Sequence, residues 1–153
     1  MSDLISHNHE EDKAMSQATI TDVSLNQTFD RLAQISQLPP NWNSYGAEPV
    51  SSVAVVKACQ LLVNVKESCY NLVGEKVLPF AVAPLADGGV QVEWRGTMGV
   101  LEVEISPDGE FGYLSIAGEG NSREFEEKDN ADWEEVLSLV SQVLIRGEEV
   151  GNA

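Results

Sequence analysis

Carboxylate side chains are the residues with the greatest chemical potential in this sequence. Residues 87–153 contain 16 acidic and 4 basic side chains, a net charge of −12. Glu93, Glu102 and Glu104 lie in two segments in which apolar and polar residues alternate. Such alternation places every second side chain on the same face of a β-sheet. We therefore expect Glu93, Glu102 and Glu104 to share the face opposite the core, and Glu124 and Glu126 to extend it.

Three interpretations of this acidic face follow from its charge. Like charges that lie opposite one another destabilise a sheet by a few tenths of a kcal/mol up to ~1 kcal/mol. The face could be a solvated surface that resists aggregation, or a docking surface, because opposite charge accelerates encounter with a basic protein. Paired glutamates could instead serve a hydrolase as acid and base. That chemistry needs a carboxyl in an apolar recess, which an open sheet face does not provide.

Other catalytic and cofactor chemistry is not indicated. His7 and His9 lie beside carboxylates in a polar segment without apolar anchors, so we expect a solvated segment and no metal site. No histidine follows them, which excludes a Ser-His or Cys-His nucleophile pair from the predicted fold. Cys59 and Cys69 are too far apart on one predicted helix to form a disulfide. No glycine motif matches a phosphate-binding loop, and we expect no cofactor.

Two aromatic residues stand between the first two predicted helices. Trp42 and Tyr45 lie in a segment that also contains Gly46 and Pro49. They could form a platform for a partner, or they could seal the edge of the core. We retain both interpretations and include both residues among the candidates for partner binding.

Helical spacing predicts two helices in the first half of the chain. Apolar residues recur at this spacing over residues 24–37, with Ser24 as the predicted N-cap, and two prolines end the helix. A second helix is predicted over residues 53–70, with Ser51 or Ser52 as its cap. Its apolar face is wide, which predicts that it is the most buried helix.

A change to two-residue periodicity predicts an antiparallel meander after Gly74. Pro79 and Pro84 confine the first strand to an edge or to irregular pairing. If Thr97 and Met98 form a two-residue turn, the next two strands pair so that every apolar residue faces the same side. That register comprises the pairs Val90 with Ile105, Gln91 with Glu104, Val92 with Val103, and Glu93 with Glu102.

The remaining elements complete an α+β fold. A strand is predicted over residues 111–117, with its buried face left open between Phe111/Tyr113 and Leu114/Ile116, and residues 123–127 predict a short charged edge strand. A final helix is predicted over residues 131–145, capped by Asn130 and ended by Gly147. We thus expect two N-terminal helices, a meander of four to five strands and a C-terminal helix on one sheet face.

Composition predicts one domain with a charged surface. The chain has 153 residues, a formal net charge of −16 and 42% hydrophobic residues, which is enough for one core. We expect a flexible arm over residues 1–22, the domain over residues 23–147 and a frayed tail over residues 148–153. Acidic chains bind nucleic acid and anionic membranes poorly, and no apolar run is long enough for a membrane span. With no signal-peptide pattern, these features predict a cytoplasmic protein.

Two motifs stand out between residues 36 and 116. The first, Leu38-Pro39-Pro40-Asn41-Trp42-Asn43-Ser44-Tyr45-Gly46-Ala47-Glu48-Pro49-Val50-Ser51, is similar to the pattern L-P-x-x-W-[DN]-x-[YP]-G-A-x-P-x-S. The second, Pro84-Leu85-Ala86-Asp87-Gly88-Gly89-Val90-Gln91-Val92-Glu93-Trp94, is similar to P-x-x-D-G-G-[VI]-x-[LF]-E-W. Together they resemble a family of small uncharacterised bacterial proteins. Because such genes can sit in mobile two-gene arrangements, the resemblance implies an antitoxin-like or accessory role, and it carries over no catalytic residue.

The sequence favours a non-enzymatic module that binds a basic protein partner, as an inhibitor, an antitoxin-like neutraliser or a dedicated chaperone. The alternatives are a small hydrolase or metal-dependent enzyme that uses clustered carboxylates, and a mimic of nucleic-acid charge. Exposed edge strands would also allow a homodimer by extension of the sheet.

Overall fold

The polypeptide combines helices with an antiparallel sheet. A computed structural model of the chain describes residues 20–73, 78–96, 99–118 and 120–152. The elements follow in the order α3 (Ile20–Ser36), α4 (Ser52–Val73), β1 (Ala81–Pro84), β2 (Val90–Gly96), β3 (Gly99–Ile105), β4 (Phe111–Ala117), a short 3-10 helix η2 (Gly120–Ser122), β5 (Glu124–Ala131) and α5 (Trp133–Asn152). The strands lie in the sheet in chain order, and all neighbours are antiparallel. The predicted α+β meander is confirmed.

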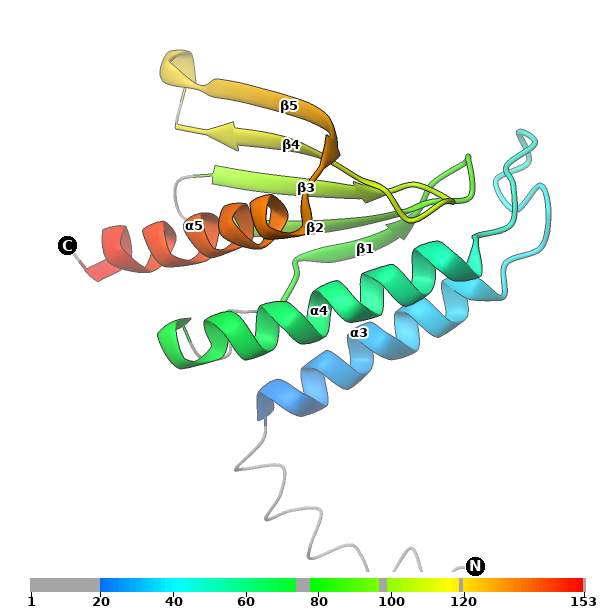
Figure 1. Cartoon of the computed structure of the whole chain (residues 1–153), viewed down its shortest axis with the longest axis horizontal. Helices are drawn as coiled ribbons and strands as arrows, with labels where there is room; N and C mark the ends of the chain where they lie inside the picture. Colours follow the sequence, from blue (N-terminus) through cyan, green and yellow to red (C-terminus); the bar gives the residue numbers. More distant parts are fainter. Residues whose placement is uncertain (1–19, 74–77, 97–98, 119, 153) are drawn as a thin grey trace, which may run out of the picture.

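Helices α3, α4 and α5 all lie on one face of the sheet (Figure 1). α5 packs against β2 and β3, and α4 lies between α3 and α5. Side chains from the helices and from one face of the strands form a continuous core. The largest fully buried members include Trp94, Leu32, Ile35, Leu61, Leu62, Leu101 and Ile105. No helix of the described ranges lies on the opposite face of the sheet.

The register of β2 and β3 is the one that alternation predicts. Val92 lies opposite Val103, Glu93 lies opposite Glu102, and the pairing continues to Gly96 and Gly99. The predicted turn residues 97 and 98 lie outside the described residues. One face of this pair is buried, and a slip of one residue would transfer all of its apolar side chains to the other face. The hydrophobic pattern therefore determines the register.

The buried face of β4, which the sequence left open, is that of Phe111 and Tyr113. Both side chains are less than 5% exposed. Phe111 contacts the half-buried Trp133, with 5.5 Å between the ring centroids, and the ammonium group of Lys57 lies over both rings. Leu114 and Ile116 consequently point to the face without helices.

The boundaries of the outer helices differ from those expected. α3 begins at Ile20, so Ser24 lies inside the helix and is not its cap, and the expected arm overlaps the helix by three residues. α5 continues through Gly147 to Asn152, where a tail was expected. One glycine costs a helix only about 1 kcal/mol, so a single residue of this kind is a weak stop signal.

The start of α5 also corrects a prediction. Asn130 does not cap this helix: it belongs to β5 and has a positive φ of 55°. Asp132 occupies the cap position, because its backbone carbonyl accepts a hydrogen bond from the amide of Val136. β5 is therefore longer than the predicted edge strand and runs to Ala131.

The start of α4 agrees with one of the two predicted caps. The hydroxyl oxygen of Ser51 accepts hydrogen bonds from the amides of Val53 and Ala54. Among the residues whose burial is described, α4 is the most buried helix, as predicted: it contributes six side chains to the buried core, whereas α3 and α5 contribute three each. Val53 and Val56 lie on its outer side and are more than half exposed. The apolar face of α4 is divided among α3, α5 and the sheet, while α5 makes the larger contact with the strands.

Candidate functional site on the open face of the sheet

The face without helices, here called the open face, is built from every second residue of each strand. The strand registers align these residues in rows that cross the sheet. The apolar row consists of Arg95, Val100, Ile116 and Phe125. The acidic row consists of Glu93, Glu102, Leu114 and Glu127. A third row contains Gln91, Glu104 and Gly112. Carboxylates and apolar groups thus lie in adjacent strips of one uncovered surface.

Glu93 has a structural role on the open face. It is only 8% exposed, and its carboxylate accepts a hydrogen bond from the guanidinium group of Arg95. The guanidinium group also lies 3.5 Å from the ring centroid of Phe80, a cation–π contact. Burial of a carboxylate is costly unless it is paired. The ion pair compensates the buried charge of Glu93 and engages the guanidinium group of Arg95. This predicted partner-binding glutamate is therefore less accessible than expected.

Glu104 is the centre of a cluster of carboxylates. It is exposed, and the structure places it near Asp87, Glu102, Asp129 and Glu127. Partial burial raises the pKa of Glu104, and the negative charges of these four carboxylates raise it further. Glu102, opposite Glu93 on the neighbouring strand, is half-buried. Two of the five predicted glutamates, Glu102 and Glu104, thus form the accessible centre of the acidic surface.

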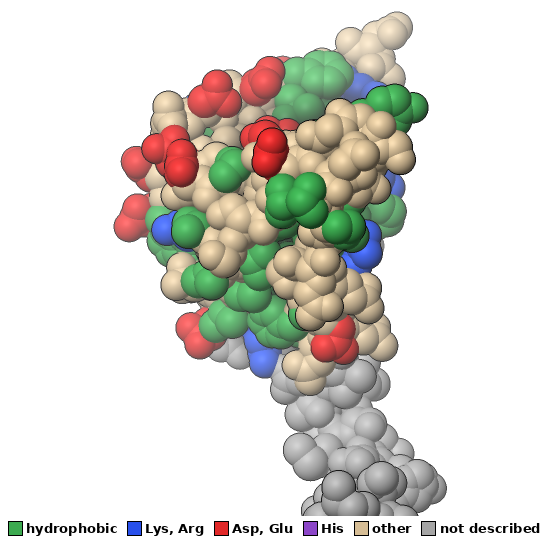
Figure 2. Space-filling model, turned by 90° about the vertical axis from the view of Figure 1, so that its right-hand side faces the viewer, with side chains coloured by type: hydrophobic (Ala, Val, Ile, Leu, Met, Phe, Trp, Pro, Cys, Tyr) green, Lys and Arg blue, Asp and Glu red, His purple; other side chains and the backbone are tan. Residues whose placement is uncertain are grey.

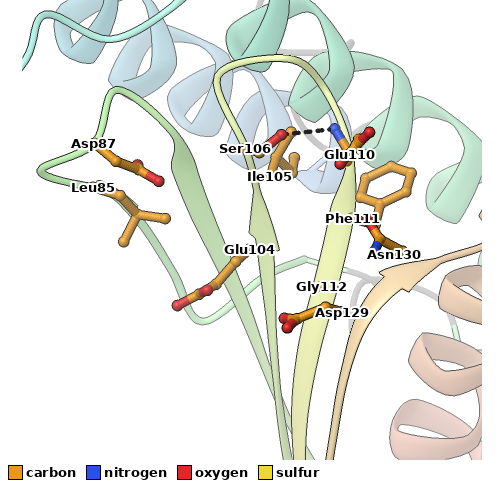
Figure 3. Close-up of a pocket in the computed structure, with 10 residues that line it drawn as sticks. All are labelled: Leu85, Asp87, Glu104, Ile105, Ser106, Glu110, Phe111, Gly112, Asp129 and Asn130. Carbon is orange, nitrogen blue, oxygen red and sulfur yellow. Dashed lines mark hydrogen bonds between the residues drawn. The ribbon is translucent and has the colours of Figure 1, made fainter.

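A pocket of about 320 Å³ lies at the end of the third row, beside the β1–β2 and β3–β4 turns. Figure 3 shows Glu104 on β3 and Asp129 on β5, with Gly112 of β4 between these strands. A side chain at Gly112 would approach the Asp129 carboxylate, since an added Cβ would lie 3.5 Å from its oxygen. Glycine therefore leaves a hollow between two carboxylates. In Figure 2, which views this end of the molecule, acidic side chains gather at the upper left and basic ones are few.

Glu124 and Glu126 do not extend the open face, which corrects the prediction. Their partners in β4 are Ala117 and Ser115, which share a face with the buried Tyr113. The hydroxyl of Tyr113 donates a hydrogen bond to Glu126, 2.5 Å away, on the helix side of the sheet. This bond is the main reason that the pKa of Tyr113 rises to about 12.

Lys128 belongs to the same helix-side group. Its ammonium group lies 2.8 Å from the carboxylate of Glu135 on α5. The hydrogen bond between them lowers the pKa of Glu135 and raises that of Lys128. This ion pair joins β5 to α5 and keeps the lysine away from the open face.

Glu127 and Asp129 are the open-face carboxylates that sequence reasoning missed. Both lie in β5, whose start and phase depend on its pairing with β4. The register shifts between Phe111 and Tyr113, and a β-bulge of this kind changes which residues lie opposite one another. Phe125 was the available signal, because its pairing with Ile116 sets the phase of β5 up to Lys128.

Trp42 and Tyr45 lie on the loop between α3 and α4, not on the strands that form the open face. The indole N–H of Trp42 donates a hydrogen bond to the backbone carbonyl of Glu48, 3.0 Å away, and the side chain is half-buried. Tyr45 is 91% exposed. The structure thus gives Trp42 a role in holding the loop, and it leaves Tyr45 as an isolated exposed aromatic residue.

The two sequence motifs contact each other. The amide of Glu48 donates to the carbonyl of Ala86, and the amide of Ser51 donates to the carbonyl of Gly88. Gly89 passes so close to β3 that an added Cβ would lie 2.3 Å from the carbonyl oxygen of Ile105. The motifs therefore hold the loop before α4 against the first strand turn, which is a structural role.

The cysteines show no sign of activation. Cys59 and Cys69 are free, and burial raises the pKa of both thiols, which disfavours the reactive thiolate. Within the described ranges, no three His, Cys, Asp or Glu side chains are arranged to hold a metal ion. His7 and His9 lie outside these ranges.

No helix in the described part of the chain is both long enough and apolar enough to cross a membrane. Comparisons with protein-family models, curated proteins and solved structures find no match to the chain. The resemblance based on the two motifs therefore stays a prediction.

Proposed function

We propose that the protein is a non-enzymatic binding module that docks a basic protein on the open face of its sheet. The main support is that no described helix covers this face and that it carries Glu102, Glu104, Glu127 and Asp129. Among the described strand residues on it, the basic one is Arg95, and Glu93 already pairs with it. The carboxylates of the open face are therefore available to a positive partner.

The charge of the whole chain would assist this binding. A formal net charge of −16 gives the molecule a negative field that accelerates encounter with basic proteins and repels acidic ones. The pKa of Glu104 is raised by partial burial and by repulsion from the surrounding carboxylates. Contact with a cation would relieve this repulsion. Binding should consequently weaken as salt screens these charges.

The apolar row supplies surface that a partner can bury. Phe125 is 65% exposed, and Phe80, stacked on Arg95, is 60% exposed. Large exposed aromatic side chains are typical anchors of protein interfaces. Apolar contact beside a charged strip suits a protein surface better than a small cation.

The alternative functions have less support. General acid catalysis would need a carboxyl held in an apolar recess, whereas Glu104 is exposed and lies among other carboxylates. Mimicry of nucleic acid would need carboxylates spaced along an elongated surface, whereas these carboxylates are grouped around Glu104. An inhibitor, an antitoxin-like neutraliser or a dedicated chaperone in the cytoplasm fits the proposal.

Co-purification from the native host tests the proposal with two matched variants. Each variant loses two exposed or half-exposed charges: Glu102→Gln/Glu104→Gln on the open face, and Asp30→Asn/Glu67→Gln on the helices. We expect the wild type to retain a basic protein at low salt and to release it at moderate salt. Recovery should fall by about fivefold or more with the open-face variant and remain unchanged with the helix variant. Equal recovery with both variants, or no salt-sensitive partner, would contradict the proposal.

A further inference from the structure

The two edges of the sheet differ in how they are protected. β1 is four residues long, ends at Pro84 and contacts α3. Short length, proline and a covering element are common ways to block further strand pairing. β5 contains eight residues and no proline, no described element covers it, and every residue from Glu124 to Asn130 is exposed.

The free edge of β5 can form further backbone hydrogen bonds. β5 is the last strand of the sheet, and β4 is its neighbour on one side. In an edge strand, alternate N–H and C=O groups point away from the sheet and have no partner strand. Figure 1 shows no described element beyond the outer edge of β5. An extended segment could therefore add to the sheet there.

The side chains of β5 select against a second copy of the same strand. In antiparallel self-pairing about the centre of the charged segment, Glu124 would face Asp129, and Glu126 would face Glu127. Like charges directly opposite one another are destabilising. The one basic residue of β5, Lys128, is already paired with Glu135. The same charges favour a basic segment.

We propose that β5 binds an extended basic segment of the partner protein, which joins the sheet as a sixth strand. This inference rests on the proposed function and adds the mode of binding. On the open face the added strand would present side chains to Phe125, Glu127 and Asp129; on the other face it would meet Glu124 and Glu126. The segment would carry Lys or Arg on both faces over about six residues.

Two synthetic peptides test this binding mode with the full-length protein. The first has about eight residues in which pairs of arginines alternate with pairs of threonines, so that arginine lies on both faces of the strand. The second is identical except for N-methylation of alternate backbone amides, which preserves charge and removes hydrogen-bond donors. We expect the first peptide to bind at low salt, and the methylated peptide to bind at least about tenfold more weakly. Amide hydrogen exchange in β5 should slow only with the first peptide.

Variants of the protein distinguish strand pairing at the edge of β5 from docking on the open face by charge alone. Glu124→Gln/Glu127→Gln should weaken binding of the first peptide severalfold, and Asp30→Asn/Glu67→Gln should leave it unchanged. If both peptides bind equally, with unchanged exchange in β5 and a loss of binding in Glu102→Gln/Glu104→Gln, the sixth strand is refuted and docking on the open face stands. Binding of neither peptide, or a dimer that protects β5 without peptide, would also refute the sixth strand.

Discussion

The hydrogen bond between Tyr113 and Glu126 is the feature at the residue scale that most affects titration. It favours the neutral phenol and raises the pKa of Tyr113 to about 12. Because the folded-state pKa lies above that of an unfolded tyrosine, near 10, this group stabilises the fold fully below pH 10. The contribution is lost as the pH rises through about 12.

We predict that ultraviolet titration resolves one tyrosine that ionises near pH 12, and that Tyr113→Phe removes this transition. The same variant should lower the free energy of unfolding at pH 7 by about 1 kcal/mol through loss of the hydrogen bond. Glu126→Gln should shift the tyrosine transition to lower pH, since the carboxylate charge is gone. An unchanged transition in Glu126→Gln would show that the hydrogen bond is not its cause.

The charged form of Glu104, in contrast, is predicted to destabilise the fold at neutral pH. Its folded-state pKa is raised by partial burial and then by surrounding carboxylates, so deprotonation disfavours the folded state. Protonated Glu104 therefore stabilises the folded state below the ordinary glutamate pKa, and this stabilisation is lost as the pH rises through the raised pKa. Glu104→Gln, which resembles the protonated form, should therefore stabilise the protein at pH 7 by a few tenths of a kcal/mol up to about 1 kcal/mol.

Denaturant unfolding as a function of pH measures this effect. The difference between Glu104→Gln and the wild type should shrink as the pH falls below the pKa of Glu104. Glu67→Gln, on the exposed face of α4, is the matched control and should have little effect at any pH. Destabilisation by Glu104→Gln at pH 7 would contradict the assigned crowding of carboxylates.

At this scale the sequence predicted the central residues of the site and missed its extent. Alternation in two well-defined strands places Glu93, Glu102 and Glu104 on one face. The sequence could not reveal that Arg95 pairs with Glu93, because both residues lie on one strand and the pairing depends on side-chain conformation. The face on which Glu127 lies depends on the register of β5 against β4, in which it is opposite Leu114, and alternation within β5 alone does not determine that register.

At the scale of elements, Ser51 connects α4 to the turns of the sheet. Its hydroxyl oxygen caps the helix and its O–H donates to the carbonyl of Pro107, 2.6 Å away. We predict that Ser51→Ala lowers the free energy of unfolding by about 1 to 2 kcal/mol. Ser52→Ala, at the exposed first residue of α4, should cost much less. Equal losses in denaturant unfolding would contradict the assignment of the cap.

Substitutions of two glycines test how closely neighbouring helices and strands approach each other. A Cβ on Gly96 would lie 2.3 Å from the carbonyl oxygen of Val143 on α5, whereas one on Gly112 would lie 3.3 Å from that of Lys128. Gly96→Ala would force α5 away from β2, and we predict a loss of about 2 kcal/mol or more. Gly112→Ala should cost less in the same unfolding measurement. The reverse order would contradict the packing of α5 on the sheet.

The elements themselves were predictable because hydrophobic periodicity determines them. The register of β2 and β3 follows from alternation, since only one register buries all of their apolar side chains. The ends of helices and strands were less predictable where the only signal was the weak preference of a single residue. Gly147 did not end α5, and Asn130 remained in β5 because Asp132, two residues later, provides the cap.

At the scale of the whole molecule, α3, α4 and α5 lie on one face of the sheet, and none of the described helices lies on the other (Figure 1). The chain concentrates its negative charge in the half that forms most of the sheet. Composition predicts that an acidic surface exists. It does not predict which elements cover it, because that depends on the side of the sheet to which α5 returns after β5.

Carboxyl footprinting of the complex tests most directly whether the open face binds the partner. Water-soluble carbodiimide labels exposed carboxylates, and mass spectrometry reads the label at each residue with and without the co-purified partner. We predict that labelling of Glu102, Glu104 and Glu127 falls on binding, while labelling of Asp30 and Glu67 on the helices does not change. Protection of the helix carboxylates with unchanged labelling of the open face would contradict the proposed function.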